Sequence, residues 1–228
     1  MTEPVTYERT GPVAKITMDD GKVNVISLTM QRAINAALDR AENDRAVVLI
    51  TGRPTVFSAG FDLKVLQAGG PDSVAMVRGG FELAARLLVH PYPVVMACPG
   101  HAIAMGVFVL LSGDYRLGAS GDYKIVANEV AIGLTMPRAA TEIMRQRLTP
   151  ATFSRALILS ESFGPNNAVA AGFLDRVVPA EELLTTAQEV AASMASLDMK
   201  AHAASKRRAR AGALEAIHAG IIADAAAW

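Results

Sequence analysis

Residues 57–64, Phe57-Ser58-Ala59-Gly60-Phe61-Asp62-Leu63-Lys64, connect a predicted strand to a predicted helix. They follow the apolar run at 46–51, which we expect to form a buried strand. Asp62 suits the start of a helix, because its carboxylate can accept hydrogen bonds from the first backbone amides. The glycine beside this helix start would leave N–H groups facing open space, which suits an anion or an oxygen that becomes anionic during a reaction. By itself the turn is equally compatible with a plain strand-to-helix connection.

A second stretch repeats this order of strand, glycine turn and helix start. The buried strand predicted at 94–98 leads into Gly100-His101-Ala102-Ile103-Ala104-Met105-Gly106, with an expected turn at 99–101. In two parallel units, Phe61 and Met105 would lie at the same end of adjacent strands, where α/β folds bind ligands. Their backbone N–H groups would then converge on one oxygen atom.

Alternating strands and helices in the first half predict an α/β core with parallel strands. Residues 6–9 and 13–18 alternate in hydrophobicity and predict a hairpin, and Ser27 is placed to cap a helix that runs to about Asn43. The last third of the chain has helical patterns and little strand signal. We further predict strands at 114–119 and 123–126, and helices at 72–88, 151–160, 165–171, 181–196, 201–211 and 214–227.

The composition is that of one domain with extensive burial. Of 228 residues, 51% are hydrophobic and 19% are charged, so part of the burial is expected between subunits. No apolar run approaches about 20 residues, and no basic segment precedes an apolar one at the N-terminus, so we expect neither a membrane span nor a signal peptide. The net charge of zero gives no basis for binding nucleic acid. Because Cys98 is the only cysteine, we expect a cytoplasmic protein without an internal disulfide or a metal site.

Several motifs resemble the crotonase superfamily, which contains enoyl-CoA hydratases and isomerases. Two are the glycine turns described above, and others are Asp114-Tyr115-Arg116, Asn128-Glu129 and the stretch at 168–178. The early segment Val23-Asn24-Val25 also fits the pattern. The motifs occur in the same order as in that superfamily, and the similarity covers residues 5–210, nearly the whole chain.

This resemblance implies a fold, an assembly and a class of substrate. The fold would be a spiral of repeated ββα units at 1–195, followed by a helical region at 196–228 that forms a homotrimer, or a hexamer of two trimers. The substrates would be acyl-CoA thioesters, and no further cofactor is expected because CoA is part of the substrate. The thioester oxygen would lie between the N–H groups of Phe61 and Met105. The implied substrate-binding residues are Val25, Ala59, Asp62, Leu63, Lys64, Gly106 and Phe108.

Carboxylates distinguish the reactions within this superfamily. Its hydratases hold a water molecule between two glutamates, and here Phe108 matches the first of them and Glu129 the second. A phenyl ring cannot accept a proton from water. A single carboxylate in a dry pocket suits proton transfer from C2 to C4 of a 3-enoyl thioester, and burial would raise its pKa. We therefore favour a Δ3,Δ2-enoyl-CoA isomerase. The alternative is an enoyl-CoA hydratase that has a reduced set of acid/base residues.

Other positions leave alternatives open. Ala104 and Met105 stand where the superfamily usually has two glycines, so the Met105 side chain is expected to line or narrow the acyl pocket, and a catalytically silent acyl-CoA-binding protein is conceivable. Lys64 and the basic cluster at 206–210 would either meet the CoA phosphates or stay solvated. Asp62 would serve either as a helix cap or as a ligand contact.

Overall fold

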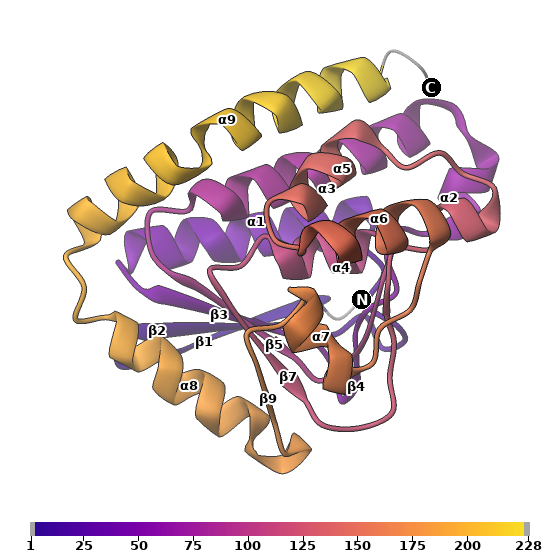
Figure 1. Ribbon diagram of the computed structural model, residues 1–228. Helices are drawn as coiled ribbons and strands as arrows, with labels where there is room; N and C mark the ends of the chain where they lie inside the picture. The colour runs from indigo at the N-terminus through magenta and orange to yellow at the C-terminus, as the bar shows by residue number, and fades with distance from the viewer. Residues whose placement is uncertain (1–2, 226–228) are drawn as a thin grey trace.

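Within residues 3–225, which the computed structural model describes, the chain forms a six-stranded sheet and a three-stranded sheet (Figure 1). In the larger sheet β1 is antiparallel to β2 and the other neighbours are parallel. In spatial order its strands are β1 (Val5–Thr10), β2 (Val13–Met18), β3 (Val47–Thr51), β5 (Val94–Cys98), β7 (Tyr115–Ala119) and β9 (Arg176–Val178). The smaller sheet is parallel and contains β4 (Thr55–Ser58), β6 (Gly100–Ile103) and β8 (Ile125–Val126).

Helices cover both faces of the larger sheet. α1 (Leu28–Asn43) and α3 (Gly70–Val89) lie on one side, and α8 (Leu183–Met194) lies on the other (Figure 1). Every residue of β3 and β5 is buried, as expected for parallel strands between two helical layers. Further helices are α2 (Leu63–Ala68), α4 (Met105–Leu111), α5 (Arg138–Arg145), α6 (Pro150–Leu159), α7 (Pro165–Ala171) and α9 (Met199–Ala225), with 3-10 turns at Val130–Ile132 and Ala180–Glu182.

The first half of the chain confirms the predicted hairpin, the first helix and the parallel core. β1 and β2 pair antiparallel, and Ser27 caps α1 by accepting a hydrogen bond from the Met30 N–H at 3.2 Å. The helix predicted from Asp72 begins at Gly70, two residues earlier. The strand order follows the expected parallel arrangement, in which helices connect β2, β3, β5 and β7.

The turn expected at 99–101 is wrong, because Gly100 and His101 belong to strand β6. Gly100 pairs with Thr55 of β4, and a Cβ atom at Gly100 would overlap the Thr55 carbonyl group. This glycine therefore permits two strands to approach closely, rather than reversing the chain. Strand β4 was also not expected, although its last residue, Ser58, lies in the 57–64 stretch.

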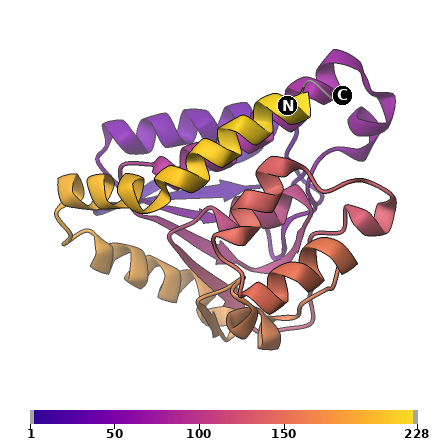
Figure 2. The same cartoon turned by 45° about the horizontal axis from the view of Figure 1, so that its top comes forward.

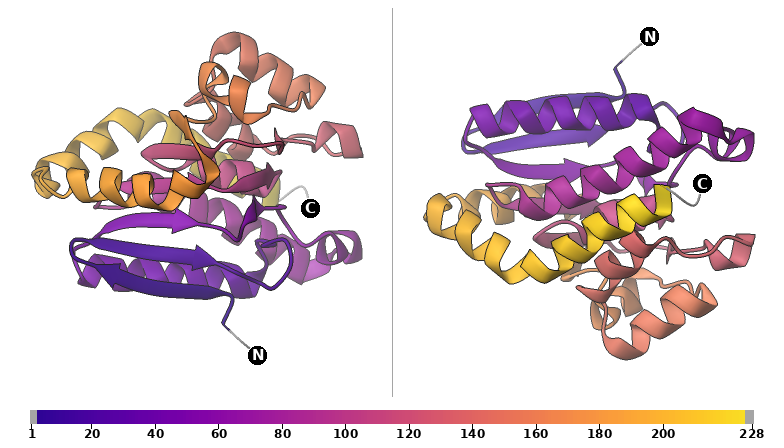
Figure 3. Two further views of the ribbon diagram at one scale, coloured as in Figure 1. Left: turned by 90° about the horizontal axis from the view of Figure 1, so that it is seen from below. Right: turned by 90° about the horizontal axis from the view of Figure 1, so that it is seen from above.

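The last third of the chain departs from the prediction in its helices and in one strand. The helices expected at 201–211 and 214–227 are a single helix, α9, which continues through Gly212, and residues 226 and 227 lie outside the described residues. A helical glycine costs about 1 kcal/mol relative to alanine, so the packing of α9 along α3 and α5 outweighs it (Figures 2 and 3). Strand β9 and helix α5 were not predicted. The predicted boundary between a spiral core at 1–195 and a helical region at 196–228 stays a prediction.

Buried ion pairs dock α9 on the body of the protein. Lys206 and Arg210 pair with Asp114 at 2.6 and 2.9 Å, and Arg210 also donates to the Leu88 carbonyl at 2.8 Å. The side chain of Lys206 is only 3% exposed, and burial lowers its pKa to about 8. These two members of the basic cluster are therefore neither solvated nor available to CoA phosphates.

We predict that Asp114→Ala lowers the free energy of unfolding by about 3–5 kcal/mol, because it leaves the buried ammonium group of Lys206 without its counter-ion. Urea titration measures the change. Arg207→Ala, which alters an exposed side chain next to Lys206 on α9, is the control and should change stability by less than about 0.5 kcal/mol. Equal stabilities of the two variants would mean that apolar contacts alone dock α9.

Candidate active site

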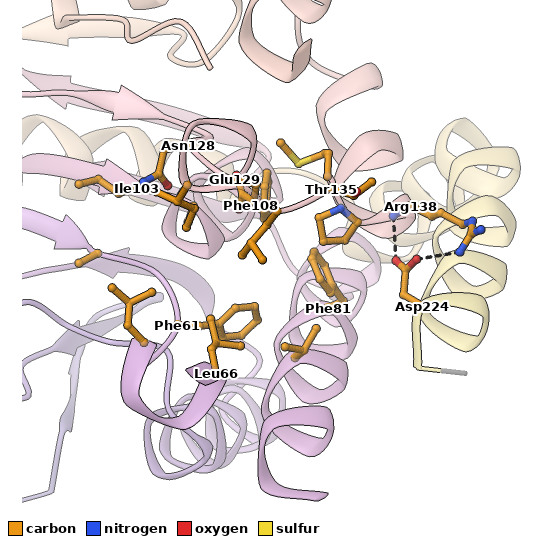
Figure 4. Close-up of a pocket in the computed structure, with 18 residues that line it drawn as sticks. Phe61, Leu66, Phe81, Ile103, Phe108, Asn128, Glu129, Thr135, Arg138 and Asp224 are labelled. Carbon is orange, nitrogen blue, oxygen red and sulfur yellow. Dashed lines mark hydrogen bonds and ion pairs between the residues drawn. The ribbon is translucent and has the colours of Figure 1, made fainter. Parts of the chain in front are cut away.

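A largely apolar cavity of about 760 Å³ lies between α2, α3, α4 and the segment at 128–138 (Figure 4). The predicted site residues that line it are Ala59, Phe61, Leu63, Phe108 and Glu129. The cavity is also lined by residues that the sequence analysis did not assign to a site: Leu66, Val77, Phe81, Ile103, Ala104, Asn128, Ile132, Leu134, Thr135, Met136, Pro137, Arg138 and Asp224.

The two glycine turns meet at the edge of this cavity. β4 and β6 pair in parallel, so both turns leave the small sheet in the same direction. Gly60 has a φ of +88°, and a Cβ atom there would lie 2.9 Å from the Ile103 carbonyl oxygen and 3.2 Å from the Met105 nitrogen. A Cβ atom at Gly106 would overlap the Ser58 carbonyl oxygen. Glycine is therefore required on each side for the turns to pack against each other.

This contact brings together the two backbone N–H groups that the sequence analysis singled out. Met105 is the first residue of α4, where a helix leaves its N–H groups unpaired, and Phe61 immediately follows Gly60. Across residues 3–225, neither the Phe61 nor the Met105 N–H has a hydrogen-bond acceptor. The arrangement offers two adjacent donors to an oxygen atom placed in the cavity.

The segment around Asn24 supports the first turn from behind. The Ser58 hydroxyl donates to the Asn24 carbonyl at 2.7 Å and accepts from the Gly60 N–H at 3.1 Å. The Asn24 side chain donates to the Phe57 carbonyl at 3.2 Å, and Val25 forms a bridge with Gly60. Val25 was predicted to bind substrate, but it does not line the cavity and instead holds the turn in place.

Ala104 occupies a backbone conformation that normally requires glycine. Its φ of +49° and ψ of −122° lie in a region that costs an L-residue about 1–3 kcal/mol. The Met105 side chain does not line the cavity, contrary to expectation, and it is fully buried instead. It points toward α3, where a Cβ atom at Gly80 would lie 3.5 Å from the Met105 methyl group. The cavity therefore stays open in spite of the missing glycines.

Glu129 is a buried carboxylate with one oxygen atom that has no partner among the described residues. The residue is 7% exposed, and its Oε2 atom has no hydrogen-bond partner among the described residues. Burial raises the pKa of Glu129 to about 7, because desolvation outweighs the hydrogen bond from its own backbone N–H. The ring centroids of Phe81 and Phe108 lie 5.9 Å apart with their planes tilted by 31°, and both rings keep the cavity wall apolar (Figure 4).

A second carboxylate, that of Asp224, reaches the far end of the cavity from α9. It accepts hydrogen bonds from the Arg138 N–H at 2.8 Å and from Arg138 Nη1 at 3.0 Å (Figure 4). Asp224 thereby caps the N-terminus of α5 and neutralises the charge of the Arg138 guanidinium group. Unlike Glu129, it is engaged by the protein and is not available as a base. No pattern near Asp224 in the sequence points to this contact, because it joins segments far apart in the chain.

Among the predicted substrate-binding residues, Asp62, Lys64 and Gly106 do not line the cavity. Asp62 caps α2 by accepting a hydrogen bond from the Lys64 N–H at 2.9 Å, which confirms the cap interpretation. The Lys64 side chain is exposed, so its contact with CoA phosphates stays a prediction.

Residues 3–225 contain neither a cluster of metal-binding side chains nor a helix that could span a membrane. No group of three or more His, Cys, Asp or Glu side chains in this range could hold a metal ion. None of the helices in this range is long and apolar enough to cross a membrane. The expectation that no cofactor beyond CoA is needed stays a prediction.

The chain is similar to a family of known proteins and to several solved structures. The profile of the family described as enoyl-CoA hydratase/isomerase matches residues 8–227. A solved structure called the enoyl-CoA isomerase of Mycobacterium tuberculosis is 51% identical, covers 100% of both chains and has a TM-score of 0.96. Another structure of the same Mycobacterium tuberculosis protein, which is called there a probable enoyl-CoA hydratase, is 52% identical, covers 98% of this chain and 95% of that one, and has a TM-score of 0.95. Human mitochondrial enoyl-CoA delta isomerase 1 is 33% identical over 180 residues, which span 77% of this chain and 60% of the human protein.

We predict that Ala104→Gly raises the free energy of unfolding by about 1 kcal/mol, because glycine adopts the positive φ at this turn without strain. Ala102→Gly is the control, since Ala102 is a buried residue of β6 without a positive φ and should lose about 1 kcal/mol or more. Denaturant midpoints report both changes. Loss of stability in both variants would show that the Ala104 methyl group contributes more by packing than its backbone costs.

Proposed function

The chain belongs to the enoyl-CoA hydratase/isomerase family, and on this basis we propose that it is a Δ3,Δ2-enoyl-CoA isomerase. The observation that carries this proposal is the single unpaired carboxylate of Glu129, which lines an apolar cavity next to two free backbone donors. The substrate would be a 3-enoyl thioester of CoA, and the product its conjugated 2-enoyl isomer. The isomerase name carried by similar proteins from Mycobacterium tuberculosis and human agrees with this choice.

The proposed reaction is a proton transfer within the substrate. The thioester oxygen accepts hydrogen bonds from the Phe61 and Met105 N–H groups, and Glu129 removes a proton from C2. The electron pair moves into a dienolate whose negative charge rests on the thioester oxygen. Loss of one such donor typically costs about 3 kcal/mol in the transition state. The carboxylic acid of Glu129 then returns the proton to C4, so the carboxylate is regenerated and no atoms are gained or lost.

Burial of Glu129 supports both halves of this transfer. A pKa of about 7 makes the carboxylate a stronger base than an exposed glutamate, while it remains substantially ionised near neutral pH. The same carboxyl group, once protonated, is an adequate acid for C4. An apolar wall excludes water that would compete for the intermediate.

A hydratase is the alternative reaction, and the cavity supports it less well. Hydration needs one group to activate water and one to protonate C2. Phe108 has no acid or base function, and the other carboxylate that lines the cavity, Asp224, is paired with Arg138. The similar protein of Mycobacterium tuberculosis carries both the isomerase and the hydratase name, so its names do not separate the two reactions and an assay must. The crowded turn that motivated the silent binding protein does not close the cavity, since neither Ala104 nor Met105 fills it, and turnover of a thioester distinguishes the two functions.

The assembly proposed for the chain is a homotrimer, or a hexamer of two trimers, in the cytoplasm. Apolar surface is available for such contacts, since Ile158 and Leu159 at the end of α6 are 59% and 70% exposed. The proposed oligomeric state and the cytoplasmic location both rest on the family resemblance.

We predict that the purified protein converts a 3-enoyl-CoA into the conjugated 2-enoyl-CoA, and that it hydrates a 2-enoyl-CoA at least about 10²-fold more slowly, because hydration lacks its second acid/base group. Formation and loss of the conjugated thioester are followed by ultraviolet absorbance. Faster hydration than isomerisation would select the hydratase alternative. Tight binding of both thioesters without turnover would select the silent binding protein.

We predict that Glu129→Gln lowers kcat/KM for isomerisation by about 10²–10⁴-fold, because the amide cannot take up the C2 proton. In the unaltered protein, kcat/KM should rise with pH up to about 7, where Glu129 becomes ionised, and level off above that value. The residual activity of Glu129→Gln should lack this rise. Glu189→Gln, the same change at an exposed position of α8, should leave rate and pH profile unaltered. Undiminished isomerisation by Glu129→Gln would refute the mechanism.

A further inference from the structure

The Asn128 carboxamide is a polar group in the cavity that the proposed proton transfer does not use. Its Oδ1 atom is buried and has no hydrogen-bond partner among the residues described. Its backbone carbonyl is already engaged, since it accepts a hydrogen bond from the Ile132 N–H at 3.2 Å. Leaving a buried acceptor unpaired costs about 1–3 kcal/mol, so this oxygen atom lowers the stability of the protein when no ligand is bound. A ligand that brings a donor to this atom would remove that cost.

The position of Asn128 indicates which part of a ligand reaches it. Asn128 follows β8, which pairs with β6 through Ile103 and Val126, so it lies beside the turn that carries the Met105 N–H. Figure 4 shows Asn128 and Ile103 together at one end of the cavity, and Arg138 and Asp224 at the other. Glu129 lies between these ends (Figure 4). A thioester can therefore bind with its oxygen at the Phe61 and Met105 N–H groups. In that position its thiol arm passes Asn128 and its acyl chain extends toward Arg138.

The chemistry of the ligand supplies one suitable donor. This step rests on the proposed function, in which the ligand is an acyl-CoA thioester. The thioester group and a simple acyl chain have no N–H or O–H group. The cysteamine unit of CoA has an amide N–H two methylene groups from the sulfur atom, and an amide N–H is a good partner for a carboxamide oxygen.

We propose that Asn128 is a positioning residue whose Oδ1 atom accepts a hydrogen bond from the cysteamine amide N–H of the thioester. Because Asn128 and Glu129 are adjacent in the chain, this bond fixes the thiol arm beside the carboxylate that acts on the carbon chain. It thereby holds C2 and C4 within reach of one carboxyl group, which is the geometric requirement for transfer without loss of the proton to solvent.

The test compares two ligands that differ only in this donor. One is the octanoyl thioester of N-acetylcysteamine, and the other is the octanoyl thioester of 2-acetoxyethanethiol, in which an ester oxygen replaces the N–H. Dissociation constants are measured by calorimetry for the unaltered protein and for Asn128→Leu. We expect the unaltered protein to bind the amide-containing thioester about tenfold more tightly, and Asn128→Leu to bind both equally.

Two further measurements separate positioning from a structural role. Asn128→Leu should be as stable as the unaltered protein or more stable without ligand, because it replaces an unpaired buried acceptor by an apolar group. Thr135→Val, which alters another polar side chain of the cavity, should keep the tenfold preference. If Asn128→Leu fails to fold, Asn128→Ala is compared with the same two ligands.

Equal affinity of the unaltered protein for the two thioesters would overturn the proposal, and so would a preference that survives removal of Asn128. Either result would leave water as the partner of Oδ1. Binding of neither thioester would overturn this proposal together with the proposed function. Normal discrimination without isomerisation of a 3-enoyl-CoA would support the role of Asn128 and refute only the proposed reaction.

Discussion

The close contact between two glycine turns is the constraint on which the candidate site depends. Gly60 and Gly106 each face backbone atoms of the opposite turn at distances that leave no room for a side chain. The parallel pairing of β4 with β6 brings the turns to the same edge, and Ser58 and Asn24 brace the first of them. Two backbone N–H groups from distant parts of the chain, those of Phe61 and Met105, therefore lie close together. Because these donors belong to the main chain, they do not depend on the chemical identity of the Phe61 and Met105 side chains.

Burial of charged groups has different outcomes at three places in this protein. Asp114 is matched by Lys206 and Arg210, and Asp224 by Arg138, so burial there produces ion pairs that fasten α9 to the rest of the chain. Glu129 has no such partner, and burial raises its pKa to about 7 instead. An unpaired buried carboxylate is destabilising in a fold, so its occurrence in a cavity is a functional indication.

Much of this site could be predicted from the sequence, because its essential parts are local. The turn around Gly60 follows an apolar strand, and the family resemblance assigned Glu129 without any knowledge of its surroundings. The strand character of Gly100 could not be predicted, because a glycine that admits a neighbouring strand has the same local pattern as one that turns the chain. The contribution of Asp224 could not be predicted either, because it arises when α9 packs on α5, and no local signal marks that contact.

The position of Ala104 shows why strain at the second turn is tolerated. Its methyl group lies in the cavity wall, and its backbone has a conformation that glycine adopts more easily. The surrounding contacts fix this conformation from both sides: the Ala104 N–H donates to Val126 of β8, and its carbonyl accepts from Val107 of α4. These two hydrogen bonds also restrict the position of the next N–H group, that of Met105, which in the proposed mechanism donates to the thioester oxygen. Rigidity of the turn, rather than the identity of its side chains, is what an oxyanion-binding site requires.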